Sequence, residues 1–117
     1  MNIIFGKERA EQLGDRFTVL ELDTFVFVNQ GIRSTAYCVV ESVPLDRLPL
    51  VESWQNLHAA LIKNYQQKNW KYCCTLINQL QGAWNSEMDS FYNELAERID
   101  QLITTDPGNS WTWEIQR

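Results

Sequence analysis

The sequence predicts an α+β fold in which a small, mainly antiparallel sheet packs against three antiparallel helices. Three observations lead to this fold class. Apolar side chains recur at helical spacing through three successive segments of residues 49–104, and residues 1–43 instead carry β-branched and aromatic runs around a glycine-containing turn. Near the C-terminus, Trp111 and Trp113 alternate with polar residues, which indicates one more strand.

The N-terminal segment has the composition of a strand pair with one short helix. Gly14 is expected to stop a helix that begins at Lys7, and Gly31 provides the turn of a hairpin. Asp23 and Thr24 interrupt the first long strand, where we expect a bend or a bulge. The expected elements are an apolar run at 3–5, a helix at 7–13, strands at 17–28 and 34–41, and a turn at 29–33.

Each of the three helical segments presents one apolar stripe at about 100° per residue. The second stripe covers nearly half of its cylinder, so the second helix is expected to lie between the other two. The stripes are Leu50, Trp54, Leu57, His58, Leu61 and Tyr65 in the first segment; Trp70, Cys73, Ile77, Leu80 and Trp84, with Tyr72, Leu76 and Ala83 beside them, in the second; and Met88, Phe91, Tyr92, Leu95, Ile99, Leu102 and Ile103 in the third.

Turn and capping signals separate these helices. Pro49 suits the first turn of the first helix. Asn69 is placed to accept a backbone N–H as the N-cap of the second helix, and Gly82 marks its end. Ser86 followed by Asp89 is close to the capping box of the third. Because only a few residues connect the helices, neighbours in sequence are expected to run antiparallel.

The C-terminal strand, residues 111–116, follows a segment of turn-forming residues at 105–110. Alternation places Trp111 and Trp113 on one face of this strand. We favour a tail that packs on the sheet or on the helices and closes the domain. An exposed aromatic patch is the functional alternative.

Length and composition are typical of one soluble domain. The 117 residues are expected to form a single domain with a β-rich part at 1–43, a three-helix part at 44–104 and a turn with a tail strand at 105–117. No apolar run approaches the roughly 18 residues that cross a bilayer, and residues 1–7 lack the apolar region of a signal peptide. We therefore expect a cytoplasmic protein with no membrane partner.

The cysteine, histidine and glycine contents argue against a metal or a nucleotide cofactor. Cys38, Cys73 and Cys74 cannot all pair within one chain, and reduced, structural thiols are the expected state. Metal sites need ligands at repeated short spacings, which this chain with its one histidine does not offer. The five glycines form no phosphate-binding loop. We expect no metal, no cofactor and no catalytic residue.

Charge is unevenly distributed along a chain of net charge −5. Residues 44–84 carry four basic and two acidic side chains, whereas residues 85–117 carry two basic and seven acidic ones. An acidic chain without a Lys/Arg cluster argues against a nucleic-acid partner. The acidic side of the third helix is either a solvated face, which we favour, or a docking surface for a basic protein. The candidate partner surface comprises Asp89, Asn93, Glu97, Asp100, Trp111 and Trp113.

His58 is the only histidine and the only side chain that ordinarily titrates near neutral pH. Its place in the centre of an apolar stripe favours a buried core residue with one hydrogen-bond partner over a catalyst. Glu21 and Asp23 have the spacing of a carboxylate pair on one side of a strand, but a solvated strand face is the commoner meaning of this spacing. A core position is likewise favoured over an aromatic cage for Tyr65, Trp70 and Trp84.

Two sets of residues resemble known families. The first set is Tyr65–Trp70, Cys73, Asp89–Tyr92, Leu95, Arg98, Pro107 and Trp111. It resembles the helical-hairpin tail, related to tetratricopeptide repeats, that follows the catalytic domain in some bacterial class III nucleotide cyclases. These positions are mainly structural, so the resemblance implies no cyclase activity.

The second set consists of three phrases, TVLELDTF at 18–25, TAYCVVESVP at 35–44 and GAWNSEMDSFYNEL at 82–95. They resemble small uncharacterised proteins of T4-like marine cyanophages. This resemblance implies a phage protein that acts in the cytoplasm of an infected bacterium. It supplies no functional residues.

The leading functional hypothesis is a non-enzymatic protein that binds a host or phage protein, or a second copy of itself, through a helix face or the tail. The alternative is a small enzyme or ligand-binding domain that uses His58 with a sheet carboxylate such as Glu21 or Asp23. A minor virion component is the second alternative.

Overall fold

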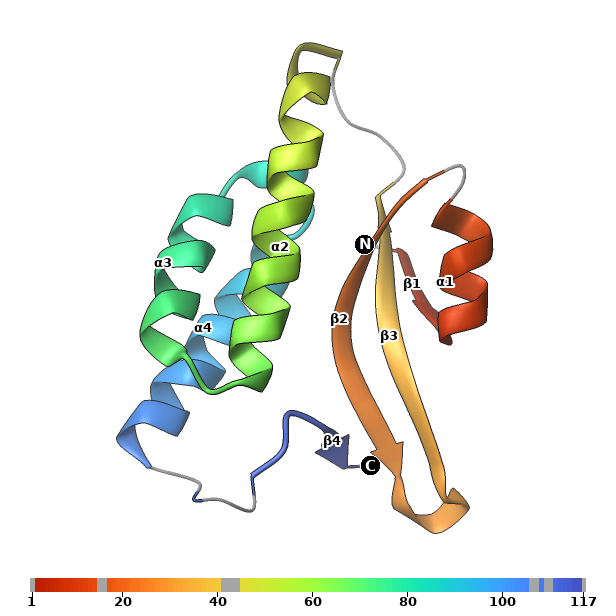
Figure 1. Ribbon diagram of the computed structural model, residues 1–117, viewed down its shortest axis with the longest axis vertical. Coiled ribbons are helices and arrows are strands. Elements are labelled where there is room, and N and C mark those ends of the chain that lie inside the picture. The colour runs from red at the N-terminus through yellow and green to blue at the C-terminus, as the bar shows by residue number, and fades with distance from the viewer. Residues whose placement is uncertain (1, 15–16, 41–44, 106–107, 109–110, 117) are drawn as a thin grey trace. The chain divides into compact units, whose positions relative to one another are not determined.

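The computed structural model describes residues 2–14, 17–40, 45–105, 108 and 111–116. The chain divides into two compact units. The sheet unit comprises Met1–Ser42 and Trp113–Arg117, and the helical unit comprises Val43–Thr112. An antiparallel sheet in the first unit and helices in the second confirm the predicted α+β class (Figure 1).

The sheet unit is built around a hairpin of β2 (Thr18–Phe27) and β3 (Ile32–Val40). The turn contains the short 3-10 helix η1 (Val28–Gln30) and Gly31, whose φ of 63° is a conformation that glycine adopts without strain. β2 and β3 shift register between Glu21 and Thr24, which confirms the expected bulge. Both parts of the predicted hairpin are therefore present.

Two further strands flank this hairpin, in the order β1-β3-β2-β4. β1 (Asn2–Phe5) pairs antiparallel with β3, and β4 (Ile115–Gln116) pairs parallel with β2. The C-terminal strand is shorter than the predicted 111–116, because only its last two residues before the terminus pair with the sheet. Most of the predicted turn at 105–110 lies outside the described residues.

The two faces of the sheet differ. α1 (Lys7–Gly14) lies over the face that carries Tyr37, so Glu11 of this helix is close to the Tyr37 phenol. Burial, and to a smaller extent the negative charges of Glu21 and Glu11, raises the pKa of that phenol. The opposite face is apolar. Phe5, Phe25 and Phe27 follow one another across it, with ring centroids 5.9 and 6.5 Å apart.

The helical unit contains α2 (Val51–Gln66), α3 (Trp70–Leu80) and α4 (Asp89–Thr104), preceded by the 3-10 helix η2 (Leu45–Leu50). A second 3-10 helix, η3 (Ala83–Ser86), connects α3 to α4. Neighbouring helices run antiparallel, as predicted (Figure 1). The buried side chains of this unit are His58, Leu61, Ile62, Tyr65, Cys73, Leu76, Ile77, Leu80, Ala83, Trp84, Met88, Phe91, Tyr92, Leu95 and Ile99.

α3 packs against both α2 and α4, as expected for the second helix. The outer helices also touch, because His58 on α2 contacts Phe91 and Tyr92 on α4. One expectation about this packing was wrong. Trp84 is buried as expected but does not belong to α3, which ends at Leu80. It lies in η3 at a φ of 58°, where it packs edge-on against Trp54.

The predicted side-chain caps were also wrong. Asn69 is the N-cap residue of α3, but its amide donates to Oδ1 of Asn64 and makes no capping hydrogen bond. Asp89 is the first residue of α4, and its Oδ1 accepts a hydrogen bond from the backbone N–H of Gly82. The carboxylate thus ties the loop after α3 to the start of α4.

Candidate functional site

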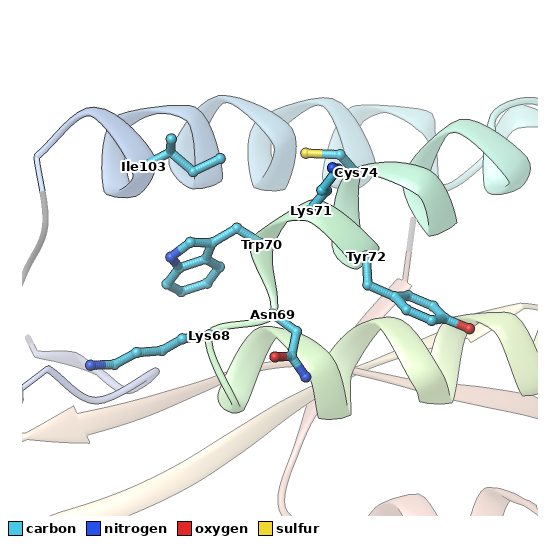
Figure 2. Close-up of a pocket in the computed structure, with 7 residues that line it drawn as sticks. All are labelled: Lys68, Asn69, Trp70, Lys71, Tyr72, Cys74 and Ile103. Atoms are coloured by element: carbon cyan, nitrogen blue, oxygen red, sulfur yellow. The ribbon is translucent and has the colours of Figure 1, made fainter.

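A shallow groove of about 820 Å³ runs around the first turn of α3. In Figure 2, Trp70 and Tyr72 leave this turn in different directions, and Ile103 approaches from α4. Tyr72 and Ile103 are 55% and 53% exposed, so both present apolar surface in the groove. The side chains that line the groove are Lys68, Asn69, Trp70, Lys71, Tyr72, Cys74 and Ile103.

An aromatic cluster supports one side of the groove. The rings of Tyr65, Trp70 and Trp111 meet at tilted or edge-on angles, with centroids 5.2 to 5.7 Å apart. Such edge-on geometry is favourable because the positive edge of one ring meets the negative face of the next. Trp111 is thus part of the helical unit's packing. This is the arrangement we favoured for Trp111.

Two lysines give the groove its charge. Lys68 is held in place, as its Nζ donates to the carbonyl of Gly108 at 2.7 Å and lies 5.9 Å from the ring centroid of Trp111. Lys71 is exposed, and the described residues give its ammonium no ion pair. The described residues that line the groove include no carboxylate. The groove is therefore positively charged in a chain of net charge −5.

The acidic residues of the candidate partner surface do not all have the same role. Glu97 and Asp100 are exposed on α4. Asp89 instead holds the loop at Gly82, and the side chain of Asn93 accepts a hydrogen bond from Gln81.

The two tail tryptophans belong to different units. Trp111 lies in the helical unit, whereas Trp113 lies in the sheet unit, where Arg33 is 5.8 Å from its ring centroid. Arg33 also forms an ion pair with Glu114 at the same end of the sheet. The predicted strand does not hold the two indoles on one face, because β4 comprises only Ile115–Gln116.

His58 occupies the centre of the helical unit. Its side chain is 2% exposed, and its Nδ1 lies 3.0 Å from the hydroxyl of Tyr92. The same hydroxyl accepts a hydrogen bond from Nε1 of Trp84 at 3.2 Å. The buried histidine with a hydrogen-bond partner is the arrangement that its position in the stripe favoured.

The other two chemical candidates have different surroundings. The three rings for which a core position was favoured over an aromatic cage divide, since Trp84 contacts Trp54 and the other two contact Trp111. Glu21 lies opposite Tyr37 on the neighbouring strand, whose pKa it helps to raise, and the bulge begins at this point. Asp23 falls inside that bulge.

The groove itself was missed, although its residues were visible in the sequence. Ile103 and Tyr72 were placed on or beside apolar stripes and were expected in the core. A usable signal was present, because Lys68 and Lys71 are interleaved with Trp70 and Tyr72 in the segment with net positive charge.

The thiols of the adjacent Cys73 and Cys74 differ in environment. Cys73 is fully buried, and this burial, together with the neighbouring Cys74, raises the pKa of its thiol from 9.0 to about 11. Between these two pH values the unfolded chain loses the thiol proton while the folded chain keeps it. The contribution of the Cys73 thiol to the free energy of unfolding is therefore fully present below pH 9 and is lost as the pH rises toward 11.

We expect the free energy of unfolding of the wild type to fall by about 2 kcal/mol more than that of Cys73→Ala over this alkaline range. Urea titrations at a series of pH values measure the difference. Cys74→Ala is the matched control and should keep most of the alkaline loss, because its side chain is partly exposed. Equal alkaline losses in the wild type and Cys73→Ala would contradict the assignment.

No group of three or more potential metal ligands occurs among the described residues. Within the same residues, no helix is both long and apolar enough to span a membrane. Comparisons of the chain with family models, curated proteins and solved structures give no match.

Proposed function

We propose that this protein is a non-enzymatic protein-binding module and that the groove at the start of α3 docks an acidic segment of its partner. The observation that carries the proposal is an exposed apolar groove bordered by two lysines. Interfaces are typically built in this way, with aromatic anchors at the centre and charged groups at the rim.

The apolar part of the groove supplies the area that a partner would bury. Tyr72 and Ile103 each expose more than half of their surface, and Trp70 is half-buried between them and the aromatic cluster. Tyr72 also lines a second hollow of about 440 Å³ between α2 and α3, so one side chain borders two concave surfaces. An aromatic residue in this position is a typical binding hot spot.

Charge decides the chemistry of the partner. Lys68 and Lys71 would attract carboxylates, and they would repel a basic protein, the partner considered as the alternative to a solvated acidic face of α4. The preferred occupant is thus a segment in which Asp or Glu residues flank a large apolar side chain. If the resemblance to cyanophage proteins reflects its origin, this partner is a host or phage protein in the bacterial cytoplasm.

The test uses peptides with one Trp, Phe or Leu between acidic residues, and matched peptides in which lysine replaces each acidic residue. We expect only the acidic set to bind, and Lys71→Glu to weaken the best peptide about tenfold, or roughly 1.4 kcal/mol. Titration calorimetry measures both effects.

Lys63→Glu is the matched control, since it makes the same charge change at an exposed position of α2 outside the groove. It should change the affinity by less than about twofold. Equal losses from Lys71→Glu and Lys63→Glu would show an effect of net charge alone, and equal binding of acidic and basic peptides would refute the docking site.

A further inference from the structure

β1 is an edge strand that lacks two common protections against pairing, a charged side chain and a proline. In the part of the chain that the structure describes, it pairs with β3 alone, on one side. Its sequence, Asn-Ile-Ile-Phe, contains no charge and no proline, the residues that commonly protect sheet edges. Ile3 and Phe5 are 51% and 50% exposed. At the other edge, β4 is only two residues long.

The hydrogen bonds of β1 establish which of its backbone groups point outward. The N–H of Gly6 donates to the carbonyl of Thr35 at 3.1 Å. In an antiparallel ladder every second residue points its N–H and C=O toward the neighbouring strand. Asn2 and Ile4 therefore direct these groups toward β3, and Ile3 and Phe5 direct theirs toward the open edge.

The side chains at this edge continue an apolar strip of the sheet. Register places Ile3 and Phe5 on the face of Phe25, opposite the face that α1 covers. Phe5 reaches Phe25 across β3 because the residues between them, Ser34 and Ala36, are small. Added strands at this edge would extend both the ladder and the strip.

We propose that the β1 strands of two copies of this chain pair antiparallel and form a continuous sheet across a two-fold axis. The axis passes beside Ile4, so that Ile3 of each copy lies opposite Phe5 of the other. In this register the outward N–H and C=O of Ile3 face those of Phe5, and each group gains a partner.

The same register explains why a second copy suits this edge. Directly opposite residues of an antiparallel pair lie on the same face, so Ile3 of one copy meets Phe5 of the other on the apolar face. The strip of each copy then runs into that of the other. A two-fold dimer needs such a self-complementary patch, and β1 provides one in four residues.

Sedimentation equilibrium from micromolar to millimolar concentration tests the proposal. We expect a reversible rise in mass from 13.7 kDa toward twice that value. Ile3→Lys should abolish the rise, because it places a charge on the open edge. Ile32→Lys is the matched control, since Ile32 is also 51% exposed and lies on the same face but at the hairpin end.

Ile3→Pro provides a second variant that leaves the ladder to β3 intact, because the N–H it removes points outward. It should also give a monomer with an unchanged circular dichroism spectrum. A wild type that stays monomeric at millimolar concentration, or an Ile3→Lys variant that associates like the wild type, would overturn the proposal. Lys71→Glu should associate normally, so this result is independent of the groove.

Discussion

Tyr92→Phe is expected to lower the free energy of unfolding by about 2–4 kcal/mol, although it removes a single oxygen atom. That oxygen is the shared hydrogen-bond partner of Nδ1 of His58 and Nε1 of Trp84. All three side chains are at most 2% exposed, so water does not replace the lost bonds. A buried polar group left without its partner costs about 1–3 kcal/mol.

This expectation holds for either tautomer of His58. The indole N–H of Trp84 can only donate, so the hydroxyl of Tyr92 accepts from it. The hydroxyl then either donates to Nδ1 of His58 or accepts a second hydrogen bond from it. Phenylalanine removes the bond in both cases, while its ring keeps the edge-on contact with Phe91.

Urea unfolding followed by circular dichroism measures the effect. Tyr72→Phe is the matched control, as the same atom is removed from a side chain that is 55% exposed. It should change the free energy of unfolding by less than about 0.5 kcal/mol. If both variants lost the same stability, the buried hydrogen bonds would contribute nothing specific to the fold.

The helices and the hairpin could be predicted because each is encoded within a few neighbouring residues. The 3.6-residue period placed Leu61, Ile77, Leu95 and Ile99 in the core, where all are buried. Gly31 and the Asp23–Thr24 interruption marked the turn and the bulge, since both depend on local backbone geometry. These signals need no knowledge of distant contacts.

Signals that depend on a competing partner were less reliable. Asn69 has the side chain of an N-cap, but Asn64 one turn earlier offers it an acceptor. Asp89 has the place of a capping-box residue, but its carboxylate accepts a hydrogen bond from the N–H of Gly82. In the sequence Trp84 continued the stripe of α3, although the extended backbone of Gln81 ends the helix before it. In each case the sequence shows which side chain is present, but it does not show which group that side chain contacts in the folded protein.

The groove could not be predicted for a related reason. Periodicity shows which side chains are apolar, but not how much of a stripe the neighbouring helices cover. Ile103 lies in the last turn of α4, and Tyr72 lies in the first turn of α3. Both were counted as core or as its border, and both are left exposed where the helices end. Apolar residues in terminal turns are therefore better candidates for interfaces than those at mid-helix.

Trp111→Ala is expected to lower the free energy of unfolding by about 2–3 kcal/mol. The indole is half-buried, and the substitution removes its edge-on contacts with Tyr65 and Trp70 as well as the ring below Lys68. The loss should stay below that of a fully buried tryptophan, because part of the ring already faces water. Heteronuclear NMR should show the indole resonance of Trp70 shifted, as its centroid lies 5.2 Å from the lost ring.

Trp113→Ala removes the same side chain two residues later and is the control. Its ring lies in the sheet unit beside Arg33, so the Trp70 resonance should not move. If the tail instead offered both indoles to a partner, Trp111→Ala would leave stability unchanged and would weaken binding only. A loss of stability with a shifted Trp70 signal therefore assigns Trp111 to the aromatic cluster, which supports the groove because Trp70 belongs both to the cluster and to the groove lining.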